Sequence, residues 1–291
     1  MRPAVRNELL RINRAFYQSL AVPFAATRNR PQPGVRRVLG EIDRGARVLD
    51  VGCGHGLAAE ELGRLGHRGP YSGIDASEPL VELARRRIEA AWVTFAIADV
   101  AQPGWRLAAP GAPYDWVLAF AVLHHLPDAS LRLQVAEDLR SVLATDGRLA
   151  VSVWDFAGTE RFQRRVVAWE EVGLTAADVE PGDALLDWRQ AGRGIRYVHH
   201  FTEQELAQLA QDAGFSVAEE FRSDGEGGRL GLYQIWRAQI NPFSNQGSGR
   251  AVSAESTLSR STEPALSVAE GFGMISKAPA DAPAHSARFD P

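Results

Sequence analysis

Three glycines at alternate positions stand directly after a short apolar run. The run Val48–Val51 contains one acid, Asp50. Gly52, Gly54 and Gly56 follow it. Glycine has no Cβ, so a backbone of this composition can turn sharply and let a ligand lie against its peptide groups. The acid before the turn suits a cationic ligand better than a pyrophosphate, and the spacing lacks the Gly-x-Gly-x-x-Gly register of dinucleotide sites.

Two further acids stand at the ends of the next apolar runs. Asp75 ends one run, and Asp99 follows the next. Ligands of open α/β sheets bind at the carboxyl ends of strands. There Asp75 could accept hydrogen bonds from both hydroxyls of a ribose, and Asp99 from an adenine amino group. Each acid alone is more simply explained as a cap or turn residue. The ordered set of three favours S-adenosylmethionine, an adenosine that carries an α-ammonium and a sulfonium.

An alternation of strands and helices must position these acids. Apolar runs predict strands over 47–51, 70–74, 92–97, 115–121 and 148–154, with helices over 56–65, 78–90 and 130–143. Two closing strands, near 215–222 and 230–237, are expected to pair antiparallel at one end of the sheet. A capped helix is expected to open at Thr202 and to end at Gly214. The sequence therefore predicts an α/β fold with a doubly wound, mostly parallel, seven-stranded sheet.

Three other segments fall outside this alternation. Residues 1–38 form a basic segment with helical apolar spacing, ahead of a sheet domain over 39–240. An insertion over 155–200, rich in Trp, Arg and Asp, is expected to cap that domain. Residues 241–291 are rich in Ser, Ala, Gly and Pro and offer little apolar surface to offset the entropy of ordering. We expect this tail to be disordered.

Four segments resemble the successive motifs of class I S-adenosylmethionine-dependent methyltransferases. They are Val48–Gly56, Gly73–Ser77, Ala96–Val100 and Tyr114–Leu126. The resemblance covers about residues 40–237 and implies a Rossmann-like fold with S-adenosylmethionine as cofactor. It places the adenosine at the glycines and acids described above, and it implies that Phe120 lies near the methionine part.

Three segments outside the cofactor motifs resemble the tRNA wobble-uridine carboxymethyl methyltransferases. Phe24–Pro33 is similar to a Thr-Arg pair before Pro-Trp-Pro, Gly182–Trp188 to a segment ending in Pro-Trp, and Arg196–Leu206 to Arg-Tyr-Tyr-His-x-Phe. Gln32 replaces the leader tryptophan and Asp187 replaces a proline. The resemblance implies tRNA as partner and a methyl ester as product. Eukaryotic members work with a small zinc-binding activator, so an activator subunit is a second candidate partner.

The implied acceptor is the carboxylate of 5-carboxymethyluridine, which is ionised at neutral pH because its free pKa is near ~4. Such an acceptor requires positioning rather than a general base. The arginine fork binds carboxylates well, so Arg28 and Arg196 are the candidate anchors. Tyr197 and His199 are expected to shape the site or stack on the base. Both arginines could equally be surface residues paired with acids, and Tyr197 could be core packing.

Arginine is concentrated at the start of the chain, although the net charge is −4. Residues 1–37 hold eight arginines and one acid, a local charge of +7. This segment could bind the phosphates of an anticodon loop, or it could be a solvated helix face. His124 and His125 are expected to end the fourth strand and line the pocket. No metal site is predicted, because no further ligand stands at metal spacing.

No apolar stretch reaches the ~20 residues that a membrane helix needs, and no secretory signal is evident. We expect a cytoplasmic enzyme. The main alternative is a small-molecule O- or C-methyltransferase of biosynthetic metabolism, which the absence of a strongly basic body favours. A non-catalytic binding module is disfavoured, because the glycine bend and all three acids are intact.

Overall fold

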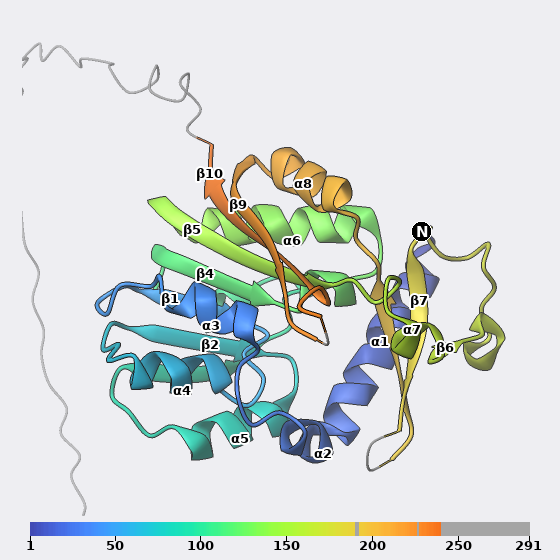
Figure 1. Ribbon diagram of the computed structural model, residues 1–291, viewed down its shortest axis with the longest axis horizontal. Coiled ribbons are helices and arrows are strands. Elements are labelled where there is room, and N and C mark those ends of the chain that lie inside the picture. The colour runs from blue at the N-terminus through green and yellow to red at the C-terminus, as the bar shows by residue number, and fades with distance from the viewer. Residues whose placement is uncertain (190–191, 226, 240–291) are drawn as a thin grey trace, which may run out of the picture. The chain divides into compact units, whose positions relative to one another are not determined.

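Seven strands form the main sheet (Figure 1) of the computed structural model, which describes residues 1–189, 192–225 and 227–239. In sheet order they are β3 (Val93–Ile97), β2 (Tyr71–Asp75), β1 (Val48–Val51), β4 (Tyr114–Phe120), β5 (Leu143–Trp154), β10 (Gly231–Ala238) and β9 (Phe215–Ser223). The first five are parallel, and β10 pairs antiparallel with both β5 and β9. The predicted fold class and the closing antiparallel pair are confirmed.

Helices cover both faces of this sheet (Figure 1). In chain order they are α1 (Pro3–Ser19), α2 (Ala21–Ala26), α3 (Pro33–Leu39), α4 (Leu57–Arg64), α5 (Glu78–Arg87), α6 (Ala129–Ser141), α7 (Glu160–Gln163) and α8 (Glu203–Asp212), with short 3₁₀ turns at Trp105–Ala108, Leu123–His125 and Trp169–Val172. The hydroxyl of Thr202 accepts the amide hydrogen of Glu205 at 3.1 Å. The predicted start of α8 is therefore confirmed.

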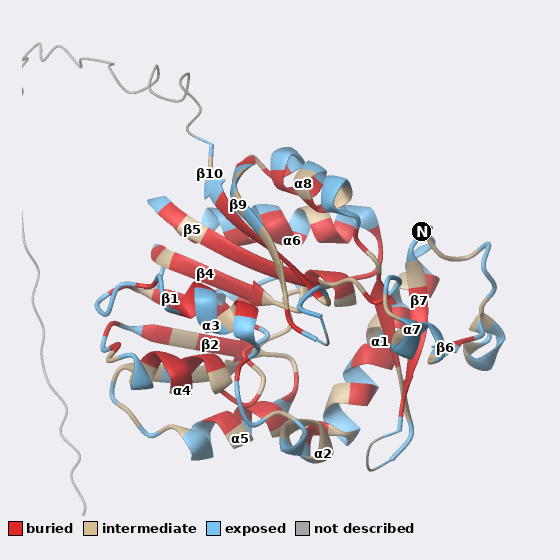
Figure 2. Cartoon of the chain, viewed as in Figure 1, coloured by how far each residue is buried: buried red, intermediate tan, exposed pale blue. Residues whose placement is uncertain are grey.

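Strand β4 lies at the centre of the sheet and is buried on both faces (Figure 2). Val117 and Ala119 pack into the cluster that contains the apolar residues of α6 and α8. Trp116 and Leu118 pack into the opposite cluster, with α3 and α4. This alternation explains the almost unbroken apolar run, because successive side chains of β4 pack into one cluster and then the other.

The insertion contains a second sheet that the sequence did not predict. Strands β6 (Val166–Val167), β7 (Asp183–Trp188) and β8 (Gly194–His199) pair antiparallel in that order. Helix α1 packs on β8, and its Asn13 exchanges hydrogen bonds with both backbone groups of Tyr197, at 2.7 and 3.1 Å. The leading helix is therefore structurally part of the cap.

The predicted tail over 241–291 lies outside the described residues. Within the described ranges, no helix has both the length and the apolar character needed to cross a membrane.

Candidate functional site

The glycine bend joins β1 to α4, and all three of its glycines have positive φ. The values are +70° at Gly52, +54° at Gly54 and +85° at Gly56, a region that residues with a side chain rarely adopt. A Cβ on Gly52 would lie 2.6 Å from a methyl carbon of Val122. A Cβ on Gly54 would meet nothing within 4 Å. The bend therefore leaves bare peptide groups at the edge of the cavity, as a closely held ligand requires.

Two buried carboxylates adjoin this bend. Asp50 accepts a short hydrogen bond from the Tyr71 hydroxyl, yet burial raises the pKa of Asp50 to about 7, and the nearby Asp75 adds to the rise. Asp75 accepts the amide hydrogens of Gly54 at 2.9 Å and Ser77 at 2.8 Å, while burial raises the pKa of Asp75 as well. Burying a carboxylate favours its neutral form unless a cation lies nearby. This end of the cavity is therefore suited to a cationic ligand.

All the predicted cofactor residues except Gly56 line one cavity of about 600 Å³ at the carboxyl ends of the strands. Asp99 and Phe120 are among them. The Asp99 carboxylate pairs with Arg14 of α1 at 2.8 Å and accepts the amide hydrogen of Ala101 at 2.9 Å. Helix α1 thus closes the side of the cavity next to Asp99. The bare bend, the two buried acids and Asp99 fit S-adenosylmethionine, whose ammonium, sulfonium and hydroxyls need acceptors.

Cationic side chains line another part of the same cavity, which we call the acceptor end. Arg196 is 3% exposed, and neither its Nε nor its Nη1 has a hydrogen-bond partner among the described residues. Its guanidinium lies 4.5 Å from the centre of the Trp154 ring. Arg28 stacks on Phe24 at 3.7 Å, and burial lowers the pKa of Arg28 to about 10, which leaves it charged at neutral pH. In the part of the chain that the structure describes, neither arginine forms an ion pair with an acid.

His125 lines the cavity and is hydrogen-bonded to α1. Its Nδ1 is 3.0 Å from the carbonyl oxygen of Tyr197, which can only accept, so Nδ1 carries the proton. Its Nε2 therefore accepts the Tyr17 hydroxyl at 2.8 Å. Burial lowers the pKa of His125 to about 3, and repulsion from Arg196 adds to the fall. His125 is consequently neutral at physiological pH and is a very weak base.

A family model described as a methyltransferase domain matches residues 24–220, from within α2 into β9. The chain belongs to this methyltransferase family. With the sheet order, the glycine bend and the strand-end acids, membership confirms the predicted enzyme class and methyl donor: the chain is an S-adenosylmethionine-dependent methyltransferase.

Curated relatives differ in the acceptor for which they are named. A tRNA (carboxymethyluridine(34)-5-O)-methyltransferase of Schizosaccharomyces pombe is 25% identical over 224 residues, 70% of this chain and 88% of the relative. One of Xenopus tropicalis is 29% identical over 141 residues, 47% of this chain. The match spans only 20% of that longer protein. A ubiquinone biosynthesis O-methyltransferase of Xylella fastidiosa is 35% identical over 113 residues, 37% of this chain and 42% of the relative.

A solved structure shares the fold of this methyltransferase. It is an S-adenosylmethionine-dependent methyltransferase from Methanosarcina mazei, with a TM-score of 0.56 and 19% identity. The match covers 72% of this chain and 99% of that one.

Two of the predicted acceptor residues of the methyltransferase do not line the cavity. Tyr197 donates to Asp183 at 2.6 Å, and His199 hydrogen-bonds Asp183 at 2.7 Å and Glu205 at 2.8 Å. Both follow the strand alternation of β8, whose successive side chains point to opposite faces. Because Arg196 faces Trp154, its neighbour Tyr197 must face away, into the cluster with α1. The structure therefore corrects the expectation that Tyr197 and His199 shape the acceptor site or stack on the base, because neither residue lines the cavity.

The expectation for the two adjacent histidines holds in part. Both lie in the turn Leu123–His125 that follows β4, as predicted. Only His125 lines the cavity, because His124 is buried behind it against Trp154, with ring centres 4.7 Å apart. Burial lowers the pKa of His124 well below its ordinary value, so it too is neutral.

Several cavity residues were not predicted as site residues. They are Tyr17, Phe24, Trp154, Arg161, Phe162, Arg165 and Trp188. They come from α1, α2, the end of β5 and the cap, and no spacing in the sequence relates these segments. For Phe24 and Trp188 the signal was the resemblance of Phe24–Pro33 and Gly182–Trp188 to the tRNA-modifying family. For Arg161 and Arg165 the signal was compositional, since the insertion is rich in tryptophan and arginine.

The basic leading segment is largely neutralised within the fold. Six of its eight arginines form ion pairs with acids: Arg2 with Asp178, Arg6 with Asp128, Arg11 with Glu8, Arg14 with Asp99, Arg36 with Glu61 and Arg37 with Glu219. These pairs favour the alternative interpretation of most of the segment, a solvated helix face, over a phosphate-binding surface. The two that remain, Arg28 and Arg30, both line the cavity.

Proposed function

We propose that this methyltransferase forms a methyl ester on the carboxylate of a carboxymethylated wobble uridine in tRNA. The observation that carries the proposal is the buried guanidinium of Arg196, whose Nε and Nη1 lack partners among the described residues. A buried charge without a counterion is costly, and so is each unmatched donor. An acceptor carboxylate would supply both the charge and the hydrogen-bond acceptors, and Arg28 would add a second cation.

The protonation state of the site supports an acceptor that is already ionised. A hydroxyl or amine acceptor must lose a proton to a base. With a pKa near 3, His125 is too weak a base for that role. Three of the cavity's carboxylates lie at the strand ends, and the fourth, Asp224, accepts from both Gly34 and Tyr233. A carboxylate acceptor needs no base, since its free pKa of ~4 leaves it ionised at neutral pH.

The roles of the residues follow from this arrangement. S-adenosylmethionine, when bound, supplies an electrophilic methyl group on its sulfonium. Asp50 and Asp75 hold and orient the cationic donor, and Asp99 lies where an adenine amino group can be recognised. Arg196 and Arg28 hold the acceptor carboxylate, while Trp154 limits the access of water. The ester that forms is neutral, so the arginines lose their attraction for it, which favours release of the product.

The choice of tRNA as acceptor has support from two directions. The S. pombe relative named for this reaction aligns with 70% of the chain. The two segments that resemble the tRNA-modifying family, Phe24–Pro33 and Arg196–Leu206, are those that place Arg28 and Arg196 in the cavity. The X. fastidiosa relative supports the alternative, a small-molecule acceptor, over a shorter stretch.

The test uses methyl-labelled S-adenosylmethionine and tRNA from a strain that lacks this gene. We expect label in the tRNA that alkali releases as methanol, as an ester requires. Unlabelled tRNA, with label entering small metabolites instead, would overturn the tRNA proposal. The assay is run with the purified chain and again with extract of the deletion strain, because the extract would supply the activator subunit that the resemblance predicts.

A further inference from the structure

A second hollow adjoins the acceptor end of the cavity, and we call it the cap groove. It has a volume of about 430 Å³ and is lined by Glu160, Arg161, Arg164, Arg165, Asp187 and Arg189. Arg161 and Arg165 line the acceptor cavity as well. These two arginines therefore stand between the hollows, and a ligand that fills both must pass them.

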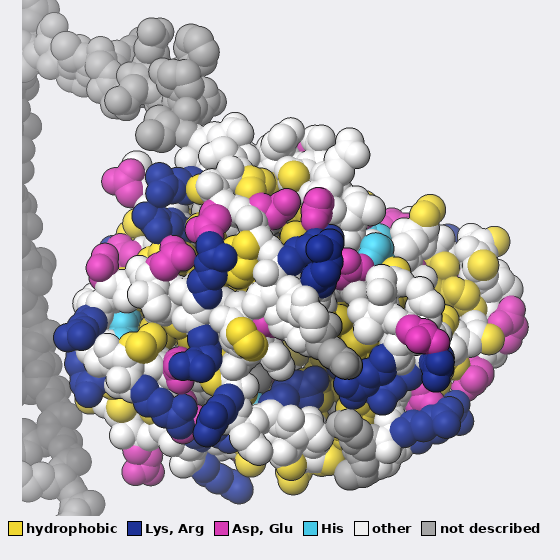
Figure 3. Space-filling view, in the orientation of Figure 1, with side chains coloured by type: hydrophobic (Ala, Val, Ile, Leu, Met, Phe, Trp, Pro, Cys, Tyr) yellow, Lys and Arg dark blue, Asp and Glu magenta, His cyan; other side chains and the backbone are white. Residues whose placement is uncertain are grey.

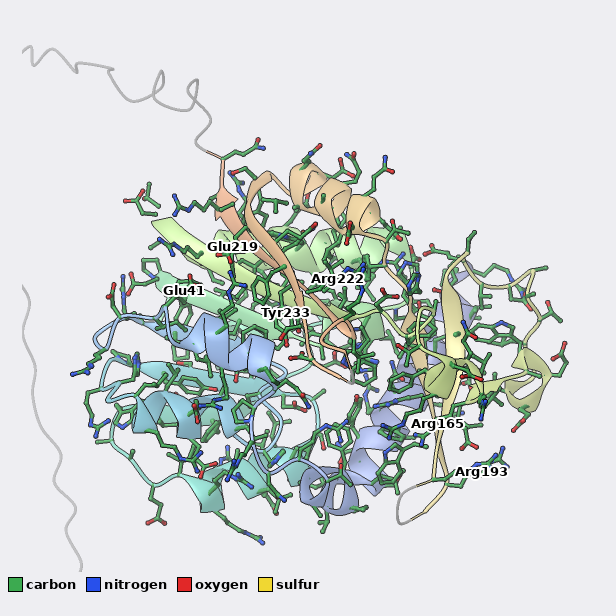
Figure 4. The ribbon with its side chains drawn as sticks, in the orientation of Figure 1. Glu41, Arg165, Arg193, Glu219, Arg222 and Tyr233 are labelled. Atoms are coloured by element: carbon green, nitrogen blue, oxygen red, sulfur yellow. The ribbon has the colours of Figure 1, made fainter. Side chains whose placement is uncertain are left out.

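Two arginines of the cap groove form ion pairs with its acids, and the other two do not. Arg164 pairs with Glu160, and Arg189 pairs with Asp187. Arg161 and Arg165 form no ion pair with any acid in the described ranges. The groove thus has an excess of positive charge, located on the two arginines that face both hollows. Figure 4 shows Arg165 on the cap, and Figure 3 shows that basic side chains gather there and on the neighbouring surface.

Most arginines of the cavity, unlike most of those in the leading segment, lack acidic partners among the described residues, and this difference indicates an anionic ligand. Six arginines there have acidic partners within the fold. Five arginines that line the cavity have no acidic partner among the described residues, namely Arg28, Arg30, Arg161, Arg165 and Arg196. One carboxylate can satisfy Arg196 and Arg28, but it leaves Arg161 and Arg165 without an anion.

We propose that Arg161 and Arg165 bind a backbone phosphate of the nucleotide adjacent to the one that is methylated. The proposal rests on the RNA acceptor proposed above. The planar guanidinium matches the geometry of a phosphate and can form two parallel hydrogen bonds with it. The phosphate lies in the cap groove, while the modified base enters the main cavity. The cap therefore distinguishes a nucleotide within a strand from a free nucleoside.

The test compares two acceptors, an anticodon stem-loop RNA that carries 5-carboxymethyluridine and the free nucleoside. In the double variant R161Q/R165Q we expect kcat/KM for the RNA to fall at least about tenfold more than for the nucleoside, because charge-assisted hydrogen bonds to the phosphate are removed. The slope of log affinity against log salt should decrease by roughly 0.7 for each phosphate that the variant no longer binds. R237Q is the matched control, because Arg237 is exposed and lies on β10 opposite Arg148, away from the carboxyl ends of the parallel strands.

An equal fall for both acceptors would overturn the proposal, and so would an equal fall in R237Q. Thermal unfolding of each variant confirms that the chain is folded. If the unmodified enzyme methylates neither acceptor, alone or with extract of the deletion strain, the proposed function has failed. Anisotropy of a labelled RNA stem-loop then tests the groove by itself. Salt-dependent binding that R161Q/R165Q weakens supports a phosphate site, and binding that it leaves unchanged refutes one.

Discussion

The two ends of the cavity have opposite charge and are built from different kinds of structure. At the cofactor end, Asp50, Asp75 and Asp99 come at or just after the ends of three parallel strands that follow one another in the sequence. At the acceptor end, Arg28 comes from a loop and Arg196 from a strand of the cap, far apart in the chain. The first end is fixed by the sheet. The second depends on how the cap closes, so it can change with the acceptor.

The largest effect should come from the acceptor end. Replacing Arg196 with Gln removes a buried charge, and the absence of two charge-assisted hydrogen bonds corresponds to roughly 100-fold or more in kcat/KM. The affinity for S-adenosylhomocysteine, measured by calorimetry, should stay the same. Arg28→Ala should act in the same direction with a smaller loss. If both variants retain full turnover, the two arginines do not anchor the acceptor.

Asp75→Ala should have the complementary effect at the cofactor end. It removes an acceptor for ribose hydroxyls and leaves the amide of Gly54 without a partner, so we expect S-adenosylhomocysteine to bind about 10- to 100-fold more weakly. Calorimetry measures the change, and circular dichroism checks the fold. Unaltered affinity would contradict the ribose assignment.

A third effect should appear as a dependence on pH. The pKa of Asp50 is raised to about 7, so Asp50 is partly protonated at neutral pH before a cation binds. The affinity for the cationic donor should therefore be about tenfold weaker at pH 6 than at pH 8, and Asp50→Asn should abolish this dependence.

The same shift predicts the sign of the stability change. Because the folded pKa lies above the unfolded value, Asp50 lowers the free energy of unfolding as the pH rises from about 4 to 7. Asp50→Asn should be the more stable protein at pH 8, which chemical denaturation can measure. A less stable variant at that pH would contradict the account of a buried, unneutralised carboxylate.

The smallest effect on catalysis should come from the residue next to Arg196. Tyr197 faces away from the cavity, so Tyr197→Phe should leave kcat/KM unchanged and lower the free energy of unfolding by about 1 kcal/mol, through loss of its hydrogen bond to Asp183. A loss of turnover comparable to that of Arg196→Gln would mean that the face of β8 has been assigned wrongly.

The residues of the cofactor end could be predicted from the sequence because their positions depend on the order of strands and helices along the chain. The bend at Gly52 and the acids at strand ends depend on an alternation of strands and helices that is visible in the apolar runs. Parallel strands then bring their carboxyl ends together without further information.

The acceptor end could be predicted only in part. The resemblance identified Arg28 and Arg196, but it also gave a role in the site to Tyr197, which strand alternation excludes once Arg196 lines the cavity. Recognition that residues 194–199 form a strand would have prevented the error. No spacing in the sequence could place Arg161 and Arg165 beside the cavity, because the cap sheet brings them there through contacts distant in the chain.

The central claim is that the buried guanidinium of Arg196, whose Nε and Nη1 have no hydrogen-bond partner among the described residues, receives a carboxylate. The most direct measurement compares the affinity of the enzyme–S-adenosylhomocysteine complex for 5-carboxymethyluridine and for its neutral amide, 5-carbamoylmethyluridine, within the same RNA stem-loop. The account predicts that the unmodified enzyme binds the acid at least tenfold more tightly and that Arg196→Gln removes the preference. Equal affinities for the acid and the amide in the unmodified enzyme would contradict it.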